Sequence, residues 1–213
     1  MFEKLYINQY AYYQPPKETP KESPKLDYVD PLFKRRLSQL SRMTIEVVKQ
    51  VKDAAPDAKI VFASLRGEIG RQLKINRSLV DEFDILPAQF SLSVFNTPPA
   101  VATIALGLKN GYTAVYPSEG RLYDAFVSAV APVLAGIEKH VIFVYGDELI
   151  PDEYAPIETS KEKIFFPFAF AMVISTEQMP GAMAVPEHIE TMSAEDVLSY
   201  LKEKKERLNG RNG

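Results

Sequence analysis

The sequence contains no cysteine and only two histidines, His140 and His188. Without cysteine the chain has no thiol nucleophile and can form no disulfide, zinc ribbon or iron–sulfur site. Two histidines far apart in the sequence also lack the spacing of a metal site, so we expect neither a metal nor a cofactor. Catalysis by a histidine base therefore has only these two candidates.

Long apolar runs and a strong net charge are also absent. No uninterrupted apolar stretch reaches the ~18–20 residues of a membrane span, and the first residues lack the apolar core of a signal peptide. The 25 basic and 28 acidic residues leave a net charge of −3, which gives no general attraction to nucleic acid or to an anionic membrane. We expect a soluble, cytoplasmic protein that binds no nucleic acid and does not span a membrane.

The residues that are present follow the pattern of one α/β domain. A chain of 213 residues fits a single domain and is long enough to bury a core. Strand-like apolar runs alternate with segments whose apolar residues repeat every three or four positions, as on one face of a helix. This alternation predicts a mainly parallel sheet covered by helices on both faces, with an antiparallel last strand because no helix precedes it. The expected strands are 5–10, 60–63, 112–116, 141–145 and one from Phe168, and the expected helices are 37–51, about 73–83, 97–108, 121–137 and one capped by Ser193.

Three features stand apart from this pattern. Residues 14–27 are rich in proline and charge, which predicts a surface loop, with a proline-rich ligand motif as the alternative. Residues 176–213 form a C-terminal tail with a helix whose basic end, from Lys202, is expected to fray. An aromatic cluster near the N-terminus suits either a protein interface or a cover for the chain's own core, and consists of Phe2, Tyr6, Tyr10, Tyr12, Tyr13 and Tyr28.

Several short patterns occur in the order found in one enzyme family, the β-ketoacyl synthases of the thiolase superfamily. The resemblance is to the N-terminal half of these enzymes, covers about residues 4–175, and is greatest to the short synthase-like proteins of aryl polyene and flexirubin-type pigment clusters. The segments that carry it are the basic helix start Arg35 to Met43, the stretch Pro87-Ala88-Gln89-Phe90, Ser93, Asn96-Thr97 and Ile104-Ala105-Leu106, the strand–turn–helix from Tyr112 to Leu122, and Gly146-Asp147-Glu148.

The resemblance implies a half thiolase-like fold, with a five-stranded mixed sheet between helix layers and an added C-terminal helix. In the family this half packs on a second, similar half of the same chain. The residues after 175 suffice for a tail helix but not for a second half. We therefore expect one synthase N-terminal-like domain over residues 1–213.

The resemblance also locates the turn that carries the family's nucleophile. The enzymes use a cysteine there to form an acyl thioester, and two histidines from the second half assist decarboxylation. Matching Leu122 to the leucine that follows the nucleophile places Ser118 at the cysteine position. We interpret Ser118 as a helix cap, with Glu119 favoured in the first turn. As a nucleophile it would need a base. His140 should lie at the opposite edge of the sheet, whereas His188, in the tail, stays open.

Four charged residues are weaker site candidates. Asp147 and Glu148 should lie at the same sheet edge as Ser118, where paired carboxylates can act as acid and base. Neighbouring residues of an extended segment point in opposite directions, so an exposed turn is the favoured interpretation. Arg66 and Arg71 are candidates for binding a phosphopantetheine phosphate or an acidic carrier protein, although a solvated loop is the simpler interpretation.

The function implied by the resemblance is that of a non-catalytic, chain-length-factor-like partner of a full-length β-ketoacyl-ACP synthase. Such a subunit serves polyketide or fatty-acid-like biosynthesis of the aryl polyene type on chains bound to acyl carrier protein. Synthases of the superfamily dimerise through the strand and buried helix that correspond here to 112–116 and about 98–108. The alternatives are a stand-alone serine acyltransferase or thioesterase using Ser118, and a homodimeric acyl-binding module. The predicted interface residues are Ala102, Ile104, Tyr112, Ala114 and Tyr116.

Overall fold

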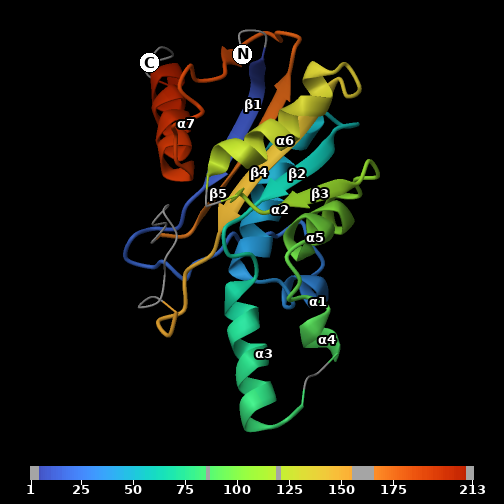
Figure 1. Cartoon of the computed structure of the whole chain (residues 1–213), viewed down its shortest axis with the longest axis vertical. Helices are drawn as coiled ribbons and strands as arrows, with labels where there is room; N and C mark the ends of the chain where they lie inside the picture. The colour runs from blue at the N-terminus through green and yellow to red at the C-terminus, as the bar shows by residue number, and fades with distance from the viewer. Residues whose placement is uncertain (1–4, 85–86, 119–120, 155–165, 210–213) are drawn as a thin grey trace.

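Two adjacent apolar strands form the centre of the sheet. The computed structural model describes residues 5–84, 87–118, 121–154 and 166–209, and in it β4 (His140–Asp147) pairs with β5 (Phe168–Ser175) (Figure 1). Every residue of β5 is buried, as expected for a strand covered by helices on both faces. The other strands are β1 (Tyr6–Tyr13), β2 (Lys59–Ala63), β3 (Tyr112–Val115) and β6 (Met183–Ala184).

The strands form one mixed sheet in the order β3-β2-β4-β5-β1-β6. β2, β3 and β4 are mutually parallel, and β5 runs antiparallel to both β4 and β1. The predicted antiparallel strand from Phe168 is thereby confirmed. The expected count of five strands is one too low, because Met183 and Ala184 pair with Ile7 and Tyr6 at the edge of the sheet.

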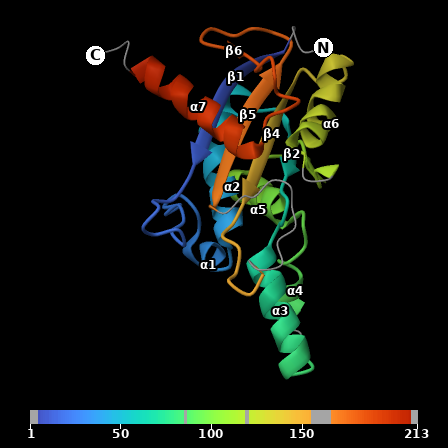
Figure 2. The ribbon, with the colours of Figure 1, turned by 60° about the vertical axis from the view of Figure 1, so that its left-hand side comes forward.

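Helices cover both faces of the sheet. α2 packs on one face with α5 beside it, whereas α6 and α7 pack on the other; α6 lies in front of the strands in Figure 1, and α7 lies across β1 and β5 in Figure 2. Ser38 starts α2 by accepting a hydrogen bond from the Ser41 amide at 2.9 Å. The helices are α1 (Pro31–Lys34), α2 (Gln39–Val51), α3 (Ile69–Asp81), α4 (Pro87–Phe90), α5 (Thr97–Leu106), α6 (Leu122–Leu134) and α7 (Ala194–Asn209).

Small residues allow α2 to approach the sheet closely. β5 alternates between small side chains toward α2, such as Ala169 and Ala171, and large ones toward α6 and α7, such as Phe170. A Cβ atom on Gly146 would lie 3.0 Å from the Ala169 Cβ and 3.1 Å from Leu40 Cδ1. Glycine at this position of β4 therefore sets how near the first turn of α2 can lie.

Several expected boundaries differ in the structure. α5 begins at Thr97, where it was expected, with Asn96 as its N-cap residue. It ends at Leu106, before the expected stop, because Gly107 adopts the left-handed conformation that ends a helix, with φ +65°. α7 continues to Asn209 instead of fraying from Lys202. The Pro-rich segment 14–27 is not wholly a surface loop, since it buries a few apolar side chains: Pro15, Pro24 and Leu26.

The aromatic cluster near the N-terminus covers the chain's own core. Tyr10 and Tyr12 pack against the core on the α6–α7 side, and Tyr13 packs against the core beneath α2. Tyr28 donates a hydrogen bond to the Glu46 carboxylate at 2.8 Å. Phe2 lies outside the described residues. Within the described ranges, none of the helices combines the length and apolar character needed to cross a bilayer.

Candidate functional site

The turn between β3 and α6 holds the serine that the resemblance placed at the nucleophile position. Ser118 is exposed, and its carbonyl accepts a hydrogen bond from the Arg121 amide at 3.0 Å. α6 begins at Leu122, and its N-cap residue is Arg121, which makes no side-chain cap bond. The interpretation of Ser118 as the cap is therefore wrong, because the helix begins too late in the chain for it. Glu119 lies outside the described residues.

In the part of the chain that the structure describes, neither histidine is hydrogen-bonded to Ser118. His140 starts β4, at the opposite end of the parallel strands from the turn that follows β3, and its Nε2 pairs with the Asp57 carboxylate. His188 is exposed in the turn before α7, where its carbonyl accepts a hydrogen bond from the Thr191 amide at 3.0 Å. Since a serine nucleophile requires a base within hydrogen-bond reach, the geometry gives Ser118 no support as one.

Asp147 is buried where an exposed turn was expected. Its carboxylate accepts hydrogen bonds from the hydroxyls of Ser64 and Tyr145, both at 2.7 Å. The amides of Leu65 and Arg66 also donate to it, at 3.2 and 3.0 Å. Burial raises the pKa of the Asp147 carboxyl, against the opposing effect of these donors. The exposed-turn interpretation is wrong, because the loop after β2 folds over the end of β4.

Glu148 points the other way along the same segment, as expected for neighbouring residues of an extended chain. Its carboxylate accepts hydrogen bonds from the Gly70 amide at 2.8 Å and the Leu40 amide at 3.5 Å, in the first turns of α3 and α2. Burial, followed by the nearby charge of Glu68, raises the pKa of Glu148 to about 7. Glu148 therefore binds and releases its proton near neutral pH.

Glu68 completes this buried carboxylate cluster, which consists of Glu68, Asp147 and Glu148. It accepts hydrogen bonds from the hydroxyls of Ser38 at 2.7 Å and Ser41 at 2.6 Å, and burial raises its pKa. Sequence reasoning missed Glu68, although a signal existed. It follows the buried strand β2, and the carboxyl ends of neighbouring parallel strands meet at one edge of a sheet.

Both arginine candidates are engaged within the chain. The Arg66 guanidinium lies 3.8 Å from the Asp147 carboxylate and is almost wholly buried. The Arg71 side chain pairs with Glu68 at 2.9 Å and donates to the Arg36 carbonyl. The solvated-loop interpretation is wrong for Arg66. The carboxylate cluster thus joins β4, the loop after β2, and the starts of α2 and α3 through hydrogen bonds. We call this cluster, with its hydrogen-bond donors, the clasp. No group of three or more His, Asp or Glu side chains in the described ranges is arranged to hold a metal ion.

A different surface of the molecule is open. β3 ends the sheet, so its outer backbone groups pair with no other strand of the described chain. α5 contacts β3, and its Ile104 is 68% exposed. Tyr116, directly after β3, is 60% exposed, while Tyr112 and Ala114 are partly buried. Ala102 is fully buried in the chain's own core, so it is absent from this surface.

An apolar groove of about 110 Å³ adjoins the same strand on its α6 side. Val115 and Thr113 of β3 line one wall of it, and Ala129 and Pro132 of α6 line the other. Both faces of β3 are therefore only partly covered. We call the outer side of β3, together with Ile104 and Tyr116, the β3–α5 surface.

Comparisons with known proteins agree with this fold. A family model described as the β-ketoacyl synthase N-terminal domain matches residues 9–209. A chain from the solved complex of the ketosynthase ApeO with its chain length factor ApeC, from Xenorhabdus doucetiae, is 25% identical with a TM-score of 0.66. That match covers 83% of this chain and 80% of the other, so the two chains are similar in length.

A more distant likeness shows the fold alone. Ketosynthase twelve of the bacillaene polyketide synthase from Bacillus amyloliquefaciens is 11% identical with a TM-score of 0.50, and the match covers 83% of this chain but 42% of that one. No curated protein matches. The family model spans most of the sequence, and the helices and mixed sheet are those of a thiolase-like ketosynthase fold. This chain belongs to the β-ketoacyl synthase N-terminal domain family.

Proposed function

We propose that this chain is a non-catalytic, chain-length-factor-like subunit that pairs with a full-length β-ketoacyl synthase. The observation that carries the proposal is the β3–α5 surface, where an open edge strand lies beside exposed Ile104 and Tyr116. Such an edge is a template for another chain, and apolar side chains exposed next to it add to the surface that a partner would cover. Family membership and the likeness to a chain of the ApeO–ApeC complex favour a synthase as that other chain.

The non-catalytic part of the proposal has two supports. These 213 residues contain no cysteine, so they cannot form the cysteine thioester that the family resemblance implies. Ser118, at the corresponding turn, is exposed and has no hydrogen-bonded histidine among the described residues. In the proposed assembly the synthase supplies the nucleophile and its histidines, and this chain helps to shape the acyl-binding site.

The proposal extends to the substrate class and setting. The substrate is a chain carried by an acyl carrier protein, in aryl polyene-type biosynthesis in the cytoplasm. The Arg66 side chain is almost wholly buried beside Asp147, so Arg71 is the more accessible of the two cations, and a carrier protein that contacts it must compete with its ion pair to Glu68. A homodimer that binds acyl chains is the other assembly that the same surface supports, and the test below separates the two.

The test is co-expression of the chain with each β-ketoacyl synthase of its source genome, followed by affinity purification and light scattering. Wild-type chain is expected to form a stable heterodimer with one of them. Ile104→Asp is expected to weaken this complex by about 2 kcal/mol or more, because a lone charge is buried on assembly. Met179→Asp is the matched control, since Met179 is 44% exposed in the segment after β5, toward the opposite end of the sheet.

Circular dichroism and thermal melts must first show that both variants are folded. A folded Ile104→Asp variant that binds the synthase like wild type contradicts the proposal. So does a mass that corresponds to a homodimer whether or not a synthase is present. Loss of binding in Ile104→Asp with retention in Met179→Asp supports it.

A further inference from the structure

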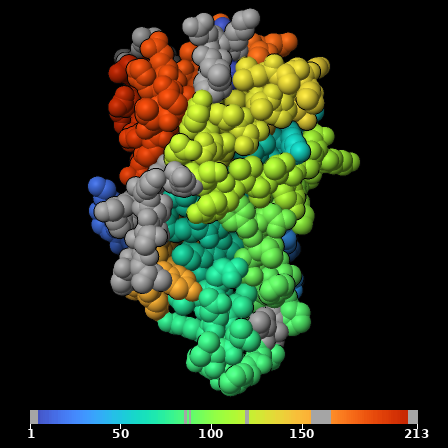
Figure 3. All heavy atoms as spheres, in the orientation of Figure 1, coloured from blue at the N-terminus to red at the C-terminus, as the bar shows by residue number. Residues whose placement is uncertain are grey.

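One part of the molecule projects away from the sheet with apolar side chains on its surface. The second half of α3 extends beyond the end of the strands, with α4 beside it (Figures 1 and 3). We call this region the arm, residues 76–84 and 87–94. Val80 is 71% exposed and Phe83 is 87% exposed. Leu79, Phe90 and Val94 also expose more than a third of their surface. Five large apolar side chains thus lie on one projection.

Phe83 combines two unfavourable features. It has a φ of +55°, just after the end of α3, where a left-handed residue is normally glycine. A bulky side chain is disfavoured in this conformation. Its ring is also the most exposed of the large apolar side chains in the described residues. Neither feature stabilises the isolated chain, which suggests that the ring is placed for a contact outside it.

The charges around Phe83 distinguish between possible occupants. Asp81, Glu82 and Asp84 flank the ring, and all three are exposed. An anionic lipid surface would repel these carboxylates, whereas a protein recess with a basic rim would attract them. Arg77 is the cationic residue of α3 nearest to Phe83 in the sequence, and it already pairs with Glu153. The occupant favoured by the arm is therefore a protein surface that is apolar at its centre and basic at its rim.

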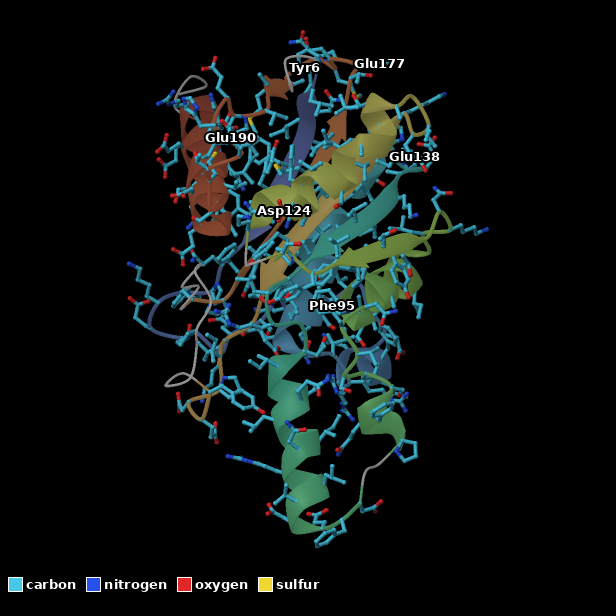
Figure 4. The ribbon with its side chains drawn as sticks, in the orientation of Figure 1. Tyr6, Phe95, Asp124, Glu138, Glu177 and Glu190 are labelled. Carbon is cyan, nitrogen blue, oxygen red and sulfur yellow. The ribbon has the colours of Figure 1, made fainter. Side chains whose placement is uncertain are left out.

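The arm is continuous with the β3–α5 surface. The Gln72 side chain of α3 donates a hydrogen bond to the Ser93 carbonyl at 2.7 Å, which ties α3 to the segment after α4. The next aromatic residue, Phe95, lies between the sheet and the arm in Figure 4 and contacts the Tyr116 ring edge-on, with centroids 6.3 Å apart. The Asn96 side chain then donates to the Tyr112 hydroxyl at 3.2 Å. A partner seated on β3 and α5 therefore meets the base of the arm.

We propose that the arm is a second docking element, which inserts Phe83 and Val80 into an apolar recess with a basic rim on the synthase subunit. This inference rests on the proposed function, because the synthase is its occupant. The arm adds a contact beyond those that β3 and α5 would make with the synthase. It also predicts that the acidic tip speeds association, since charges at a rim act mainly on the rate of encounter.

The test measures the affinity of the purified synthase for the full chain carrying Phe83→Gly. Glycine removes the ring and adopts the left-handed conformation freely, so this variant is expected to melt at or above the wild-type temperature. Its affinity for the synthase is expected to fall at least about tenfold, as for a central aromatic contact. Val80→Asn is the second variant, and Met179→Gly is the control for loss of an exposed apolar side chain elsewhere.

The outcomes separate this inference from the proposed function. If Ile104→Asp loses binding while Phe83→Gly and Val80→Asn bind like wild type, the arm inference is overturned and the proposed function stands. If wild-type chain binds no synthase, both are overturned. Binding to vesicles of anionic phospholipid that Phe83→Gly abolishes, or self-association that it abolishes, also overturns the arm inference. A tenfold loss in Phe83→Gly, with Met179→Gly unchanged and slower association for Asp81→Lys at low salt, supports it.

Discussion

At the scale of single residues, the most constrained groups are the three carboxylates at the carboxyl end of the sheet. Each is buried and accepts hydrogen bonds from backbone amides or hydroxyls, so none is left without compensation. Glu148 and Glu68 repel each other within this cluster, and Arg71 faces both. The clasp is therefore sensitive to protonation, and its effect on stability has a definite sign.

We expect the chain to lose stability as the pH rises from about 5 to 8. The pKa of Glu148 is raised from 4.5 to about 7, so the folded state holds a proton that the unfolded state releases. The resulting stabilisation is complete below the unfolded pKa and is lost as the pH passes the folded one. Glu68 and Asp147 shift in the same direction.

Glu148→Gln should reduce this loss by on the order of 2–3 kcal/mol, since it removes the titrating group but keeps an acceptor for the Gly70 amide. Urea unfolding at pH 5 and pH 8 measures the difference, with exposed Glu203→Gln as the control. Equal pH dependence in wild type and Glu148→Gln would show that Glu148 ionises normally in the folded chain.

Ser118→Ala is expected to change the free energy of unfolding by no more than about 0.5 kcal/mol, because Ser118 is exposed and does not cap α6. The chain with either residue is expected to form no acyl-enzyme. Intact-mass spectrometry after incubation with acyl donors checks this, together with thermal melts. An adduct that is present in wild type and absent from Ser118→Ala would establish the serine-enzyme alternative.

At the scale of secondary-structure elements, packing of α2 on β4 and β5 sets the distances in the clasp. α2 contributes the Leu40 amide to Glu148 and the Ser41 hydroxyl to Glu68, so it must lie close to the end of the sheet. Gly146 makes that approach possible, since a side chain there would meet Leu40, Ala169 and the Phe168 carbonyl within 3.3 Å.

Gly146→Ala is expected to destabilise the chain by about 1–3 kcal/mol, as overpacking of a dense core does. The methyl group meets backbone as well as side chains, so the strain cannot be relieved by one rotamer change. Chemical denaturation measures the loss. Gly107→Ala is not a suitable comparison because φ is positive there, whereas exposed Ser128→Ala in α6 provides a packing-neutral control. A Gly146→Ala protein as stable as wild type would mean that α2 can move away freely.

At the scale of the whole molecule, the two edges of the sheet differ. At one edge, β6 pairs with the start of β1. Beside this edge, α7 places the Lys205 ammonium 5.0 Å and the Lys202 ammonium 6.0 Å from the centre of the Tyr12 ring. Lysines beside an edge strand discourage pairing with another chain. At the other edge, exposed Ile104 and Tyr116 lie beside β3, and the Phe95–Tyr116 contact connects this surface to the apolar arm. The molecule thus has one edge flanked by lysines and one open edge flanked by exposed apolar side chains, and the proposed assembly uses the open edge.

The type and order of the main elements could be predicted from local pattern. β2, β4 and β5 are runs of apolar residues, α2 has one apolar face, and Pro167 excludes the chain before Phe168 from the ladder. The exclusion of cysteine chemistry required only composition. Boundaries such as the end of α5 were less predictable, because Gly107 and Gly111 both adopt positive φ and either can end a helix.

The sequence by itself determined the α/β class, the antiparallel strand from Phe168 and the absence of a thiol, because these depend on composition and on the spacing of neighbouring residues. Only the tertiary structure decided that Asp147 and Glu148 are buried, that Ala102 is internal while Ile104 is exposed, and that Ser118 is not a cap. Ser64 and Asp147, for example, lie 83 residues apart and are joined by a 2.7 Å hydrogen bond. Burial and pairing of this kind arise from contacts between distant segments, and no local period carries that information.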